Sequence, residues 1–161
     1  MNSLKNFFGF FFGFKGRIGR LHYALFLLVL AVSYLFASMI LELMNIGRVL
    51  YNNPTTRYTE YLVYLSAIFA LLIVLKYSLI IRRIHDFNEK ATGNKLFQAI
   101  LWADILSLFN LSITYEMKHF VNLAMTVISI SCLIILAFKK GDIKENDFGK
   151  PQIPFWKKTN S

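Results

Sequence analysis

The sequence predicts an all-α membrane protein, a bundle of four transmembrane helices with both termini in the cytoplasm. Its mean hydropathy is +0.49, and 56% of its residues are hydrophobic while only 17% are charged. That balance is far more apolar than a soluble domain of 161 residues would have. Sixteen Phe and eight Tyr add rings that favour the water–membrane boundary. The excess apolar surface therefore faces lipid, and the length fits one domain.

Four stretches are candidates to cross a bilayer, whose apolar core takes about 20 helical residues. The spans are expected at about 21–43, 61–81, 96–115 and 119–138. The first and last have charge-free centres, and the second is interrupted only by Lys76. The third is the weakest, because it contains the polar residues Gln98, Asp104, Ser107, Asn110 and Ser112. Two helices with a re-entrant hairpin remain an alternative to four full spans.

Lysine and arginine lie unevenly between the predicted loops. Fourteen of the 18 fall on one side, three on the other, and Lys76 lies within a span. Since positive flanks resist translocation, the rich side is cytoplasmic and carries both termini. Anionic headgroups can then neutralise the net charge of +9, so no nucleic acid partner is needed to explain it. The larger group is Lys5, Lys15, Arg17, Arg20, Arg82, Arg83, Lys90, Lys95, Lys139, Lys140, Lys144, Lys150, Lys157 and Lys158.

An interfacial segment and a polar tail flank the transmembrane domain, which is expected at 21–138. Residues 1–20, "MNSLKNFFGFFFGFKGRIGR", alternate Phe and Gly and are expected to lie on the cytoplasmic leaflet, with a floppy lipid-touching tail as the alternative. Residues 139–161 are rich in Lys, Gly and Pro and are expected to form a partly ordered cytoplasmic tail.

The segment "KYSLIIRRIHDFNEK" places four ionisable residues at the end of the second predicted span: Arg82, Arg83, His85 and Asp86. Arg17 and Arg20 enter the first span at the same membrane level. Guanidinium forks bind phosphate with paired hydrogen bonds, and a neighbouring aspartate or histidine can hold them in place. The six residues form a candidate site for an anionic headgroup or a partner, against the simpler interpretation of a positive flank.

The sequence contains no pattern that identifies a catalytic, metal-binding or cofactor-binding residue. No glycine-rich phosphate loop, HExxH or GxSxG motif is present. His85 beside Asp86 is weak evidence for a metal or catalytic pair, since a metal site needs three or four ligands. Cys132 is the single cysteine and is expected to be a small apolar side chain in the last span. We expect no cofactor, and a non-catalytic role is favoured over an enzymatic one.

Lys76 and Asp104 are the two charges in the interior of the predicted spans, since Glu42 marks the end of the first. Lys76 lies six residues, about 9 Å of helix, before Arg82, and its side chain can snorkel to the boundary. An ionised aspartate near mid-membrane costs roughly 2.5–3.5 kcal/mol, so Asp104 needs a partner or a proton. Lys76 is the candidate partner. A structural ion pair and a proton- or ion-handling site both fit.

Three motifs in order resemble the bacterial inner-membrane family known as domain of unknown function 805 (DUF805). They are "FKGRIGRLHY" at 14–23, "RRIHD" at 82–86 and "KGDIKENDFGKPQIP" at 140–154. Residues that match the family pattern are Phe14, Gly16, Arg17 and Arg20 in the first, Arg82, Arg83, His85 and Asp86 in the second, and Gly141, Asn146, Phe148, Gly149 and Pro151 in the third. The resemblance implies a multi-pass protein of the bacterial cytoplasmic (inner) membrane.

The chain departs from the family pattern at two places. Ala24 follows the Tyr of the first motif, where relatives usually carry an aromatic residue. The sequence "FNEKATGNKLF" after the second motif lacks the usual paired Trp residues. These changes put a shared role for the segment 87–95 in doubt. The family name itself implies no activity.

Two functions from different classes remain. In the first, the chain is a non-catalytic membrane module whose arginines grip an anionic lipid headgroup or a partner, either another membrane protein or a second copy of the chain. In the second, it is a small transporter or membrane enzyme that uses Asp104 with Lys76, or His85 with Asp86. The first is favoured, since no second acidic group joins Asp104 in the interior of the spans.

Substitution at Asp104 separates the two roles of the intramembrane pair. If the pair is structural, Asp104→Asn lowers the thermal stability of the purified protein because Lys76 loses its counter-charge, and adding Lys76→Met restores it. Thermal unfolding in detergent measures both. A stable Asp104→Asn variant without a rescue effect would contradict the structural pair.

Overall fold

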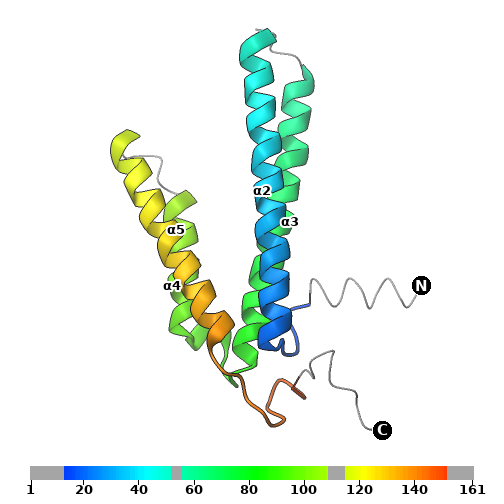
Figure 1. The fold of residues 1–161 in the computed structure, drawn as a ribbon, viewed down its shortest axis with the longest axis vertical. Coiled ribbons are helices and arrows are strands. Elements are labelled where there is room, and N and C mark those ends of the chain that lie inside the picture. Colours follow the sequence, from blue (N-terminus) through cyan, green and yellow to red (C-terminus); the bar gives the residue numbers. More distant parts are fainter. Residues whose placement is uncertain (1–12, 52–55, 109–114, 152–161) are drawn as a thin grey trace, which may run out of the picture. The chain divides into compact units, whose positions relative to one another are not determined.

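The computed structural model describes residues 13–51, 56–108 and 115–151, and its regular elements are helices (Figure 1). They are α2 (Arg20–Tyr51), α3 (Thr56–His85), the short 3₁₀ turn η1 (Ala91–Gly93), α4 (Lys95–Leu108) and α5 (Tyr115–Phe138). The described ranges contain no β-strand, only an isolated bridge between Asn146 and Gly149. The predicted all-α class is confirmed.

Three of the helices are long and apolar enough to cross a membrane. The qualifying segments are Arg20–Met44, Val63–His85 and Met117–Phe138. Helix α4 has 14 residues, a length of about 21 Å, which is short of the 30 Å apolar core of a bilayer. The rest of the predicted third span, 109–114, lies outside the described residues, as do residues 1–12 of the predicted interfacial segment. The chain is therefore a multi-pass membrane protein, with three span-length helices among the residues that the structure describes.

The chain divides into two units, and the first holds most of α2 and α3. Leu30 and Ala37 of α2 pack with Leu72 of α3, and the rings of Tyr34 and Phe69 lie 6.0 Å apart beside them. Much of the remaining surface is exposed and apolar, as expected for a face that contacts lipid. Serine hydroxyls on these helices donate to carbonyls of their own helix, which satisfies them without water.

The second unit combines residues 14–24 with residues 79–161. It contains the first turn of α2, the last two turns of α3, and all of α4 and α5. Helix α4 packs along α5 in antiparallel direction (Figure 1). Ile100 and Ala103 of α4 are buried, as are Cys132 and Leu136 of α5. Cys132 is thus an apolar packing residue, as the sequence predicted.

A polar network fixes the start of α4 in this unit. Asn94 Oδ1 accepts hydrogen bonds from the backbone N–H groups of Leu96 and Phe97 at 3.0 and 3.1 Å, which caps the helix. Asn94 Nδ2 donates to Glu89 at 2.5 Å, and Lys139 after α5 donates to the same carboxylate at 3.0 Å. These bonds from Lys139 and Asn94 lower the pKa of Glu89. Glu89 therefore links the start of α4 to the end of α5.

Candidate functional site

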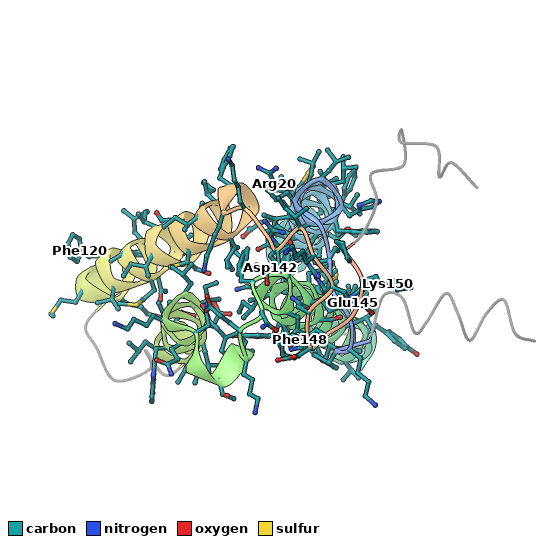
Figure 2. The ribbon with its side chains drawn as sticks, turned by 90° about the horizontal axis from the view of Figure 1, so that it is seen from below. Arg20, Phe120, Asp142, Glu145, Phe148 and Lys150 are labelled. Carbon is teal, nitrogen blue, oxygen red and sulfur yellow. The ribbon has the colours of Figure 1, made fainter. Side chains whose placement is uncertain are left out.

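The candidate site lies in the second unit, where three segments far apart in the sequence meet. These are the entry segment (residues 14–19), the end of α3, and the segment that follows α5. Arg17, Arg83 and Asp86 are buried at their junction, and we call these three side chains the node. Figure 2 shows the last segment, with Asp142, Glu145, Phe148 and Lys150, running past the end of α3.

Asp86 is the centre of the node. Its Oδ1 accepts two hydrogen bonds from Arg17, at 3.1 Å from Nε and 2.8 Å from Nη2. Its Oδ2 accepts one from Arg83 Nη1 at 2.5 Å. The Asp86 side chain is 7% exposed and both arginine side chains are fully buried. Two guanidinium groups from different parts of the chain therefore share one carboxylate.

The remaining donors of Arg17 point to backbone carbonyls beyond α5. Nη1 donates to the carbonyl oxygens of Lys144 at 2.8 Å and Gly149 at 3.1 Å, and Nη2 donates to that of Asp142 at 2.5 Å. A guanidinium has five N–H groups. With the two bonds to Asp86, Arg17 uses all five within the chain.

Arg83 bonds to the last turn of α5 and to the entry segment. Its Nε donates to the carbonyl of Leu136 at 2.9 Å, Nη2 to that of Lys139, and Nη1 also to that of Ile18 at 3.2 Å. The last carbonyls of a helix lack partners in the helix and carry its partial negative charge. A buried arginine supplies both the missing donors and the favourable charge.

The entry segment reaches the node through a glycine turn. Gly16 has φ +85°, a left-handed conformation that side chains rarely adopt. The turn brings the N–H of Ile18 to the carbonyl of Arg82 at 3.2 Å and the carbonyl of Gly16 to His85 Nδ1 at 3.1 Å. Ile18 is fully buried beside the node.

Residues 139–151, which we call the strap, cross the end of α3. The N–H of Asp142 donates to the carbonyl of Asp86 at 2.8 Å, and Asn146 Nδ2 donates to that of His85 at 3.0 Å. The ring of Phe148 stacks on the His85 ring at 3.9 Å with an interplanar angle of 5°. Gly149 has φ +118° and closes the turn. The described part of the predicted polar tail is thus a bonded part of the site.

Gly141 allows the strap to approach Asp86. A Cβ atom at this position would lie 1.8 Å from Asp86 Oδ2 and 2.4 Å from its Cγ. Both distances are far shorter than a van der Waals contact, and two arginines hold the Asp86 carboxylate on its other sides. Only glycine therefore fits between the strap and the node.

The carboxyl group of Asp86 is buried and surrounded by hydrogen-bond donors. Burial raises the pKa of Asp86, while the hydrogen bond from Arg17 and the charge of Arg83 act against that shift. Three N–H donors from two cations stabilise the ionised form of the carboxyl. The charged carboxylate is accordingly the species that holds the node.

The structure divides the predicted site residues between inward and outward positions. Arg17, Arg83 and Asp86 meet in the node, Arg82 is buried next to it, and His85 packs against the strap. Arg20 is exposed. Lys76 belongs to the first unit and Asp104 to the second, so their pairing stays a prediction. Among the residues described, no three His, Cys, Asp or Glu side chains are grouped to hold a metal ion.

Sequence reasoning missed the backbone part of the site. Six carbonyl oxygens bind the two arginines, from Ile18, Leu136, Lys139, Asp142, Lys144 and Gly149. Every residue has a backbone carbonyl, so the sequence does not show which carbonyls bind a side chain. The available signals were Gly141 and Gly149, glycines within an otherwise charged segment.

These features define a class of protein: a multi-pass membrane protein whose helix ends are joined by a buried arginine–aspartate node. A family model described as "Protein of unknown function (DUF805)" matches residues 11–150. The chain belongs to this family, as the three motifs predicted. The match includes all residues of the node and the strap up to Lys150. No curated protein and no solved structure matches the chain.

Replacement of Gly141 tests the close approach of strap and carboxylate. Gly141→Ala forces Asp86 away from its arginines, and we expect a loss of about 3 kcal/mol, since overpacking and breaking a buried ion pair both contribute. Unfolding in detergent, followed by circular dichroism, measures it.

Gly93→Ala is the matched control for that experiment. A Cβ at Gly93 meets nothing within 4 Å, so this variant is expected to unfold like the wild-type protein. Equal stability of the two variants would contradict the packing of Asp86 against Gly141.

Proposed function

We propose that the protein is a non-catalytic module of the bacterial cytoplasmic membrane that binds anionic phospholipid headgroups at its cytoplasmic face. The observation that carries this proposal is the division of the basic residues of the second unit. Arg17 and Arg83 are fully buried and bonded within the chain, whereas Lys15, Arg20, Lys140, Lys144 and Lys150 around them are exposed. The buried pair organises the helix ends, and the exposed cations meet the headgroups.

We also propose four membrane crossings with both termini in the cytoplasm. The start of α2 and the ends of α3 and α5 meet in one unit, so they share a membrane face. The start of α5 then lies at the opposite face, because α5 is long enough to cross. The chain between α3 and α5 must therefore cross back, and α4 is the helix described there. A full crossing is therefore favoured over a re-entrant hairpin.

Labelling of single cysteines tests this topology. In a Cys132→Ser background, Lys118→Cys at the start of α5 is expected to react with a membrane-impermeant maleimide in intact cells. Lys144→Cys on the strap is expected to react only after the membrane is permeabilised. Protection of Lys118→Cys in intact cells would favour the re-entrant hairpin.

Exposed cations are suited to headgroup binding by their chemistry. Each Lys or Arg near an anionic leaflet contributes about 1 kcal/mol of attraction. Arg20 starts α2, and Lys140 and Lys144 lie on the strap, so all three belong to the same unit as the node. Their side chains are exposed and leave the node intact when replaced.

Native mass spectrometry of the detergent-purified protein tests headgroup binding. Wild type is expected to retain anionic phospholipid, and the triple variant Arg20→Gln, Lys140→Gln, Lys144→Gln to bind it about 100-fold more weakly, the effect of three such charges. The control replaces Arg48, Arg57 and Lys118, the three cations predicted at the opposite face, by Gln. Equal retention by both triple variants, or none by wild type, would overturn the proposal.

The alternative function, a transporter or membrane enzyme, gains less support at His85 and Asp86. Asp86 accepts three hydrogen bonds from arginines, and His85 Nδ1 lies 3.1 Å from the Gly16 carbonyl while its ring stacks on Phe148. Structural partners therefore occupy the atoms of both side chains that a proton-transfer pair would use. The alternative at Asp104 and Lys76 remains a matter for the substitution experiment described above.

A further inference from the structure

We propose that Arg17 is itself a phosphate-binding residue whose binding edge is occupied by the strap, so that strap closure and phosphate binding exclude each other. This inference rests on the proposed function, because it names how the headgroup site is regulated. The ligand is a phosphate monoanion or dianion, most directly the phosphate of an anionic phospholipid. Four observations on the second unit carry it.

The node has an excess of positive charge. Arg17 and Arg83 carry two positive charges against the single negative charge of Asp86, and all three side chains are at most 7% exposed. The other bonds of the two arginines go to neutral carbonyls. A buried charge without a counter-charge is costly even when it is hydrogen-bonded. An anion at this point would neutralise the node.

The donors of Arg17 fall into two groups. Nε and one N–H of Nη2 bind Asp86, and this group holds the guanidinium in place. Both N–H groups of Nη1 and the second of Nη2 bind the strap carbonyls of Lys144, Gly149 and Asp142. The second N–H of Nη2 and one N–H of Nη1 lie parallel on the end-on edge of the fork, the arrangement that arginine uses for two phosphate oxygens. The strap carbonyls therefore stand where phosphate oxygens would bind.

The strap is held to the node by polar contacts rather than by apolar burial. None of the residues 139–151 is buried, and Ile143 at its middle is 92% exposed. Its anchors are the three hydrogen bonds from Arg17, the backbone and side-chain hydrogen bonds to the end of α3, and the stack of Phe148 on His85. Segments with few buried apolar contacts open at low free energy. The strap can therefore leave while the helices stay packed.

Arg83 is bound differently and marks the fixed half of the node. Its carbonyl partners Leu136 and Lys139 belong to or directly follow α5, and Ile18 is a buried residue of the entry segment. Opening the strap beyond Lys139 removes none of these bonds. Arg83 and Asp86 thus keep the guanidinium of Arg17 oriented when the strap is displaced.

Hydrogen–deuterium exchange of the strap in lipid nanodiscs tests the exclusion. We compare full-length protein in phosphatidylcholine with protein in an equal mixture of phosphatidylcholine and phosphatidylglycerol, and follow the peptide that covers residues 140–151. The expected result is exchange faster by about tenfold or more in the anionic nanodiscs. An anionic surface concentrates protons and by itself slows base-catalysed exchange, so acceleration reports opening of the strap.

Two variants sharpen the test. Phe148→Ala removes the stack on His85 and is expected to accelerate strap exchange about two- to tenfold in phosphatidylcholine, the range for loss of one aromatic pair. It is also expected to retain more anionic phospholipid than wild type in native mass spectrometry. Ile143→Ala, on the same strap but touching little, is expected to match wild type in both measurements.

A soluble source of the ligand is tested with inorganic phosphate added to the phosphatidylcholine nanodiscs. Acceleration by inorganic phosphate assigns the site to free phosphate, and acceleration by phosphatidylglycerol alone assigns it to the headgroup. Strap exchange that is unchanged by both would overturn the inference and make the strap a permanent lock. Headgroup binding through Arg20, Lys140 and Lys144 is measured separately by lipid retention, so the two proposals fail independently.

Discussion

The second unit depends on the ion pairs that the Asp86 carboxylate forms with two arginines. The carboxylate neutralises one of two buried guanidinium groups and orients both, at distances of 2.5 to 3.1 Å. Removing one partner of a buried ion pair leaves a charge that the interior cannot solvate. Gly141 and the turn at Gly16 are needed because they let backbone approach this carboxylate and bring Arg17 to it.

The node also solves a problem common to helices that end near a membrane surface. The last carbonyls of α5 have no partners within the helix, and lipid cannot supply them. Arg83 satisfies two carbonyls there with a rigid fork, which a lysine ammonium could not match in geometry. Exposed cations surround this fixed centre, and in the proposed function they face headgroups. Under that proposal, the buried and the exposed basic residues have separate tasks.

The parts of the site that depend on neighbouring charged residues could be predicted from the sequence. The parts that depend on how the backbone folds back on itself could not. The charges at Arg82 to Asp86 predicted a helix end, and α3 ends at His85. Arginines beside an aspartate predicted the ion pairing that the structure shows. The strap was expected only as a partly ordered tail, since carbonyl partners and the stack of Phe148 on His85 depend on three-dimensional approach. The third predicted span, which ends as a described helix at Leu108, was the least certain because its polar residues weaken the apolar signal.

The contacts of Arg17 have a consequence for the order in which the chain folds. Its strap partners lie 125 to 132 positions later in the sequence, so α2 and α3 are made and inserted long before these carbonyls exist. Domains fold from the N-terminal side during synthesis, and until the strap emerges Arg17 must satisfy its donors with water or lipid. The arginine nearest the beginning of the chain is therefore the last to be enclosed, and its burial marks the completion of the fold.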